Sequence, residues 1–152
     1  MRSILCFLLF AACVMGQNAG DDKVAIGNLT STLVGIGKAD ASRARLTERL
    51  ADDMLALANR DHEPSRTVVL GFTGEFTAAL HGKELSSRSV TVLQQSIVDV
   101  MRATSATFVP AASLRQILSQ AGVDSTKAQL ITRRFMAIGE EIKGPDDLGS
   151  RQ

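Results

Sequence analysis

The chain has 152 residues, and its 17 basic and 16 acidic side chains leave a formal net charge of +1 at pH 7. A nucleic-acid-binding domain normally carries a strongly basic surface, so this balance argues against DNA or RNA as a partner. The sequence contains neither Trp nor Tyr, which argues against aromatic platforms that stack on sugars or bases.

The first sixteen residues have the composition of a secretory signal peptide. Arg2 supplies a positive charge, residues 4–15 are apolar with two small cysteines among them, and the chain becomes polar after Gly16. Such a run is typical of an export signal, and it is shorter than the roughly 20 apolar residues that a membrane-spanning helix needs. We therefore expect residues 1–16 to direct the chain to the periplasm or out of the cell.

Two processing routes are consistent with this segment. Val14 and Gly16 stand where a signal peptidase recognises small residues if it cuts before Gln17. Residues 10–13 instead resemble a bacterial lipobox, in which Cys13 would be acylated and become the first residue of a lipoprotein. Both cysteines of the chain lie in this segment, so a chain cut after Gly16 has no thiol for a disulfide, for nucleophilic attack or for zinc binding.

Apolar residues recur at spacings of three and four over most of the remaining chain, which is the period of an amphipathic helix. Four stretches show it clearly: Leu46, Leu50, Met54 and Leu57; Val69, Phe72, Phe76 and Leu80; Val90, Leu93, Ile97, Val100 and Met101; Ile131, Phe135, Ile138 and Ile142. A shorter helix is expected from Pro110 to the residue before Gly122. A weaker one is expected around Leu29 and Ile36, where glycines interrupt the pattern. The sequence thus predicts an all-α, four- to five-helix bundle-like domain at 17–143 and a flexible tail at 144–152.

Polar residues and a proline mark the expected starts of three of these helices. Asp40 or Ser42 is expected to cap the first clear helix, and Ser86 or Ser87 the third, because such side chains accept hydrogen bonds from free backbone N–H groups. Pro64 is expected in the first turn of the second helix, where its missing N–H does no harm.

The third clear helix carries no charge between Arg88 and Asp99. Surface helices normally place Lys and Glu on the wet side, so this helix is expected to be covered on more than one side. A central position in the bundle would explain the missing charges. The alternative is a partner surface formed by Ser89, Gln94, Gln95 and Ser96.

Few residues are suited to catalysis or metal binding. His62 lies in a polar turn and His81 in the last turn of a helix, and neither has a second ligand at the spacing that metal sites use. We therefore assign no catalytic residue, no metal ligand and no cofactor. Asn28 begins a glycosylation sequon, which matters only in a eukaryotic secretory pathway.

Residues 114–135 resemble the helix-turn-helix of DNA-binding proteins, with Gly122 in the turn and Arg133 and Arg134 beyond it. Leu118 and Ala128 depart from that pattern at two core positions. The resemblance implies a cytoplasmic regulator, which the export signal and the balanced charge oppose.

The sequence favours an exported domain that acts through binding or structural contact rather than catalysis. Its expected partner is an unknown protein or a small apolar ligand, not nucleic acid, and the expected membrane contact is through the signal peptide or a lipid anchor. Two alternatives remain open at this point. One is a small metal-dependent or hydrolytic enzyme, and the other is the helix-turn-helix regulator.

Overall fold

The computed structural model describes residues 22–58, 62–103 and 107–143, and within these ranges the chain forms six helices and no strand. An unlabelled first helix occupies residues 22–38. It is followed by α2 (Arg43–Leu57), α3 (Arg66–Leu80), α4 (Ser87–Met101), α5 (Phe108–Gln120) and α6 (Ser125–Lys143). The all-α prediction is confirmed. The segments at 1–16 and 144–152, including Cys13, lie outside the described residues.

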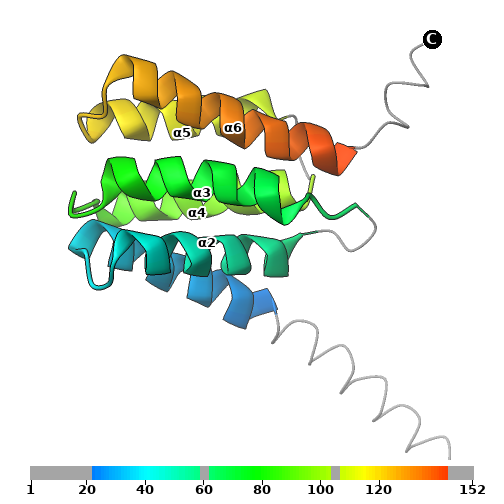
Figure 1. The fold of residues 1–152 in the computed structure, drawn as a ribbon, viewed down its shortest axis with the longest axis horizontal. Helices are drawn as coiled ribbons and strands as arrows, with labels where there is room; N and C mark the ends of the chain where they lie inside the picture. The colour runs from blue at the N-terminus through cyan, green and yellow to red at the C-terminus, as the bar shows by residue number, and fades with distance from the viewer. Residues whose placement is uncertain (1–21, 59–61, 104–106, 144–152) are drawn as a thin grey trace, which may run out of the picture.

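The helices run along a common axis in two layers of three (Figure 1). The front layer contains α2, α3 and α6, in which α3 packs between the other two. The back layer contains the helix at 22–38, then α4 and α5. Contacts of α5 with α6 and of α4 with both α2 and α6 join the layers. Because consecutive helices are joined by short turns, neighbours in the chain run in opposite directions.

The predicted count of four to five helices is wrong, because the glycine-containing segment at 22–38 forms a full sixth helix. Its side chains Leu29, Leu33 and Ile36 are all fully buried. Glycine lowers intrinsic helix stability by about 1 kcal/mol per residue, but burial of one large aliphatic side chain contributes about 1.5–3 kcal/mol. Packing against the rest of the bundle therefore outweighs the weak local preference.

Three helices begin with a serine cap. The hydroxyls of Ser42, Ser65 and Ser86 accept hydrogen bonds from backbone N–H groups three residues ahead. Ser42 and Ser86 were among the expected caps. The expectation for Pro64 is wrong: α3 begins two residues later, because Ser65 caps it by accepting a hydrogen bond from the N–H of Val68, and Pro64 is buried ahead of the cap.

The core contains the residues that the helical periodicity selects. Phe72, Phe76 and Phe135 are fully buried, and the ring centroid of Phe72 lies 5.3 Å from that of Phe76 and 5.1 Å from that of Phe135. These distances are typical of favourable aromatic pairs. The cluster joins α3 to α6, and the other side chains expected in the core are also buried: Leu50, Leu57, Leu93, Ile97 and Ile138.

A hydrogen bond between Thr32 and Asp53 joins the first helix to α2. The hydroxyl of buried Thr32 lies 2.5 Å from a carboxylate oxygen of Asp53 and 3.0 Å from the carbonyl oxygen of Asn28. A hydroxyl has one hydrogen, so it cannot satisfy both acceptors while Asp53 is ionised. Loss of hydration on burial raises the pKa of Asp53 above 3.8, although the bond from Thr32 and the charge of Arg49 oppose the rise.

We expect Asp53→Asn to change how stability depends on pH. Because the raised pKa means that folded Asp53 holds its proton more tightly than unfolded Asp53, the wild-type chain gains stability from this group as pH falls from 7 through the folded pKa. The gain levels off below the unfolded pKa of about 3.8. The measurement is urea unfolding of both chains from pH 7 to pH 3. As the pH falls, the difference in the free energy of unfolding should shift in favour of wild type over Asp53→Asn, which keeps an acceptor for Thr32.

The variant Thr32→Val provides the matched comparison for that experiment. It removes the hydrogen bond that favours ionised Asp53, so the pH-dependent gain of the otherwise wild-type chain should become larger. Parallel pH profiles for wild type and Asp53→Asn would show that this carboxyl does not titrate differently on folding.

Candidate functional site

The uncharged helix α4 is the middle helix of the back layer, in contact with α2, α5 and α6. An ion pair of 2.9 Å between Arg102, at its C-terminal end, and Asp22 also connects it to the first helix. Seven of its fifteen residues are buried. Its position between other helices covers these residues, while Thr91 and Gln95 of the uncharged stretch are exposed.

The four residues of the expected partner surface do not share one face of α4. Ser96 is buried, and its hydroxyl donates to the carbonyl of Val92 in the same helix. Gln95 is exposed and donates to Asp99 of the same helix, while Gln94 is half-buried and lies about 100° further around the helix. Ser89, also half-buried, lines a surface groove.

That groove lies between the start of α4 and α5. It encloses about 380 Å³, and its lining is mainly polar: Ser86, Arg88, Ser89, Val92, Ser113, Gln116, Ile117 and Gln120. The hydroxyls of Ser86 and Ser89 already bond to each other at 3.0 Å. The groove therefore offers a polar surface whose groups are partly satisfied within the chain.

The two histidines lie at opposite ends of α3. A ring nitrogen of His81 lies 2.9 Å from the carbonyl oxygen of Ala41, which ties the end of α3 to the turn before α2. His62 is exposed in the turn before α3. Over the described ranges, no group of three His, Cys, Asp or Glu side chains comes together in a way that could hold a metal ion.

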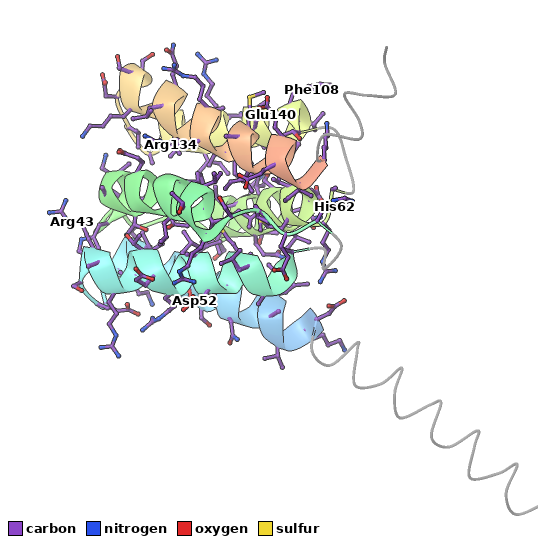
Figure 2. All side chains as sticks on the ribbon, turned by 45° about the vertical axis from the view of Figure 1, so that its right-hand side comes forward. Arg43, Asp52, His62, Phe108, Arg134 and Glu140 are labelled. Atoms are coloured by element: carbon purple, nitrogen blue, oxygen red, sulfur yellow. The ribbon has the colours of Figure 1, made fainter. Side chains whose placement is uncertain are left out.

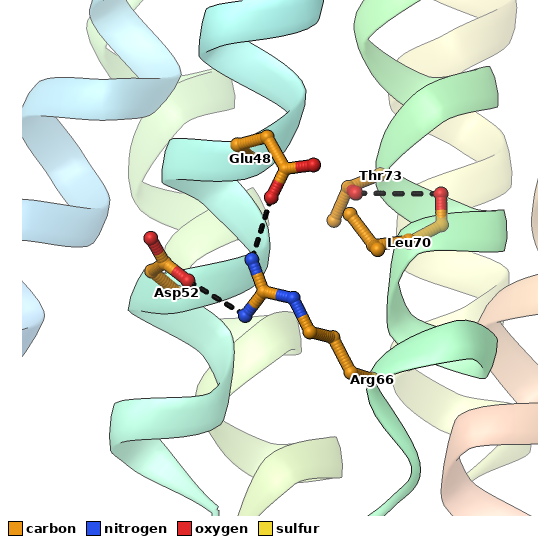
Figure 3. A network of polar contacts seen from close by, with 5 residues as sticks. All are labelled: Glu48, Asp52, Arg66, Leu70 and Thr73. Atoms are coloured by element: carbon orange, nitrogen blue, oxygen red, sulfur yellow. Dashed lines mark hydrogen bonds and ion pairs between the residues drawn. The ribbon is translucent and has the colours of Figure 1, made fainter.

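The most connected charged group bridges α2 and α3 (Figure 3). The guanidinium of Arg66 donates to Glu48 at 2.5 Å and to Asp52 at 2.8 Å. All three side chains are about half exposed or more, so water and salt weaken the attraction. This network fastens α2 to α3.

A second groove runs between α5 and α6 and has a different character. It encloses about 540 Å³ and is lined by Phe108, Ala111, Ala112, Arg115, Gln116, Ser119, Gln120, Thr132 and Met136. Phe108 is 67% exposed at the start of α5, and Figure 2 shows it at one end of the bundle. Arg115 makes no ion pair with any residue in the described ranges. The groove therefore combines apolar walls with a free positive charge.

Sequence reasoning missed this groove because it placed the start of the fifth helix at Pro110. In the structure α5 begins at Phe108, so Phe108 and Val109 belong to its first turn and both are exposed. The sequence feature that could have indicated the groove is the pair of large apolar residues, Phe108 and Val109, directly before Pro110. Periodicity alone cannot show whether such residues face the core or solvent.

The helix-turn-helix resemblance is not matched by the packing of this segment. Figure 1 shows α5 and α6 side by side and antiparallel, with Gly122 in a left-handed conformation in the turn. A DNA-binding helix-turn-helix sets its two helices at a steep angle so that the second can enter a groove. Here the middle of α6 is instead buried, with Ile131 and Phe135 in the core.

Among the described residues, no helix is both long and apolar enough to cross a membrane. Comparison with protein-family models finds no match, and comparisons with curated proteins and with solved structures find no significant similarity.

Proposed function

We propose that this chain is an exported helical domain that works by binding, and that the groove between α5 and α6 is its binding surface. The observation that carries the proposal is Phe108, a large aromatic side chain left 67% exposed beside an apolar groove in a chain with few aromatic residues. Exposed apolar side chains that gather beside a groove are typical of contact sites, and aromatic residues often anchor them.

The chemistry of the groove indicates an apolar partner segment with an acidic group. Ala111, Ala112 and Met136 provide the walls, and small side chains there leave room for the apolar face of a helix. Arg115 offers a planar guanidinium that can bind a carboxylate through two hydrogen bonds. A negatively charged amphipathic helix of another protein matches both features.

Export is the second part of the proposal and is supported by the sequence of residues 1–16. The partner of a domain outside the cytoplasm would be another exported protein or a membrane protein. The enzyme alternative receives no specific support from the arrangement of the described side chains, so binding remains the proposal.

We expect Met136→Glu to weaken binding in this groove about tenfold, because it removes roughly one buried apolar contact from the site. The probe is anilinonaphthalene sulfonate, an apolar anion whose fluorescence rises when it leaves water. It shares both required features with the proposed partner. Titration of the probe into the purified chain measures the dissociation constant.

Ala137→Glu provides the matched control, because Ala137 is an exposed neighbour on α6 that does not line the groove. It adds the same charge to the same helix, so its dissociation constant should stay at the wild-type value. Arg115→Gln should also weaken binding, since the probe then loses its ionic partner. Equal affinities for Met136→Glu and Ala137→Glu would contradict the proposal.

A further inference from the structure

We propose that a helical hairpin of an acidic protein, two antiparallel helices joined by a short turn, packs on both sides of α5. One helix of the hairpin lies in the α5–α6 groove, and the other lies in the groove between α4 and α5. The inference rests on the proposed function for the first groove, and it adds the second groove and the architecture of the partner.

α5 is an edge helix that has the surface composition of a covered one. It packs against α4 and α6, and it lies at the margin of the back layer (Figure 1). Seven of its residues are exposed, and Arg115 is the one charged residue among them, whereas α2 exposes seven residues of which five are charged. Burial within the bundle does not explain missing charges at exposed positions. A protein interface does, because Lys, Glu and Asp are depleted there while Arg, Met and aromatic residues are enriched.

The two grooves form one continuous surface across α5. Gln116 and Gln120, one turn apart on this helix, line both grooves. Thr132 and Met136 of α6 form the far wall of one groove, and Val92 of α4 lies in the other. The two glutamines are therefore a ridge with a groove on each side. Helices pack by placing side chains in the grooves of their neighbours, so each groove takes one helix and the ridge lies between them.

Each groove contains one guanidinium that makes no ion pair within the described ranges. Arg115 lines the α5–α6 groove, and Arg88 lines the α4–α5 groove. No exposed residue of α4 or α5 is acidic. The carboxylates of this face lie at its margins, where Asp99 accepts a hydrogen bond from Gln95 and Glu84 precedes α4. Because a guanidinium binds a carboxylate through two parallel hydrogen bonds, both helices of the partner are expected to carry acidic residues.

The length of α5 favours two partner helices over one. Its 13 residues make a helix about 20 Å long, so a single helix in one groove is matched over only about four turns. A stable interface usually takes about 20–30 residues from each side. Isolated helices of this length are also marginal in water, and pairing in a hairpin supports each of them. A hairpin therefore supplies the contact area in a preformed partner.

A second copy of this chain does not match the face. Packed face to face, two copies would bring two pairs of arginines together with no exposed acidic residue on α4 or α5 of either copy. Like charges across an interface weaken association. The exposed Glu48 and Asp52 of α2 already hold Arg66, so α2 does not offer a free acidic surface either. The partner is therefore a different protein.

Photo-cross-linking of the full chain, in the cells that make it, tests the inference. Ser119 lines the α5–α6 groove, Ser113 lines the α4–α5 groove, and Ala44 is exposed on α2. Each residue is replaced in turn by photoreactive benzoylphenylalanine, and the cross-linked peptides are identified by mass spectrometry. We expect the reporters at Ser119 and Ser113 to link to two consecutive helices of one acidic polypeptide, and the reporter at Ala44 to give no such product.

A charge reversal in one groove should weaken contact in the other, because one hairpin occupies both. Arg88→Glu in the chain with the reporter at Ser119 is expected to lower the cross-linking yield about tenfold, since a repulsion replaces an attraction. Arg43→Glu is the matched control and should keep the wild-type yield. Arg43 lies in the first turn of α2 as Arg88 lies in the first turn of α4, and the helix dipole favours Glu at both places.

Five results would overturn the inference. They are cross-links from the two grooves to different proteins, cross-links to a second copy of this chain, a product at only one groove position, no product at all, and an unchanged yield for Arg88→Glu.

Failure of this inference is distinguishable from failure of the proposed function. Arg88 does not line the α5–α6 groove, so Arg88→Glu should bind anilinonaphthalene sulfonate as wild type does. A product at Ser119 without one at Ser113 would overturn only the hairpin and leave the α5–α6 groove as a binding surface. Equal probe binding by Met136→Glu and Ala137→Glu, together with no product at Ser119, would overturn the groove and the hairpin with it.

Discussion

Replacement of Phe135 by alanine is expected to destabilise the domain by about 3–5 kcal/mol, because it leaves a cavity where a whole aromatic ring was packed. Phe135 is fully buried on α6 and contacts Phe72 of α3 with a centroid separation of 5.1 Å. The loss removes burial and also an aromatic pair that joins the two helices. Urea unfolding followed by circular dichroism measures the change, and Phe76→Ala should behave similarly.

The same substitution at Phe108 gives a matched control. Phe108 is 67% exposed, so Phe108→Ala should change the free energy of unfolding by less than about 0.5 kcal/mol. The comparison separates the aromatic residues that build the fold from the one that we assign to contact with other molecules. A loss below about 1 kcal/mol for both Phe76→Ala and Phe135→Ala would show that the aromatic cluster is not the packed centre of the domain.

Introduction of a lysine at Ser96 is the second substitution with a large expected effect. Ser96 is 5% exposed on α4 and lies within the packed bundle. The added side chain overpacks the site at a cost of about 1–3 kcal/mol, and an unpaired ammonium adds a desolvation cost. The melting temperature and the urea midpoint of the Ser96→Lys chain should both fall clearly.

Gln95→Lys provides the control for the same charge on the same helix. Gln95 is exposed and hydrogen-bonded to Asp99 one turn later, and a lysine there can pair with the same carboxylate. Its stability should therefore stay near the wild-type value. If Ser96→Lys is as stable as Gln95→Lys, burial of α4 does not explain why this helix lacks charge.

The two serines of the expected partner surface show how far sequence reasoning can reach. Ser89 and Ser96 are the same residue type on the same helix, and both were assigned to one face. In the structure Ser96 is buried while Ser89 lines a groove beside α5. Which side of an uncharged helix is covered depends on where its neighbours lie, and that information is not contained in the helix itself.

The sequence by itself determined the helical nature of the chain and most of its core. Apolar spacing of three and four residues places Leu50, Phe72, Phe76 and Phe135 on inward faces whatever the arrangement of the helices. Local chemistry also determined two helix starts, at Ser42 and Ser86, because a cap bonds to its own helix. These features depend on interactions between residues that are close in the chain.

Only the tertiary structure decided the features that join distant residues. Helix formation at 22–38 depends on burial of Leu29, Leu33 and Ile36 against other helices. Gly139 is a poor helix residue in isolation, yet a Cβ there would lie 2.6 Å from the side chain of Thr107, so close packing requires glycine. The α5–α6 groove likewise exists only because two amphipathic helices meet along part of their length, which leaves Phe108 outside the core. Long-range packing energies of several kcal/mol override local preferences of about 1 kcal/mol, and the position of a neighbouring helix cannot be inferred from local periodicity.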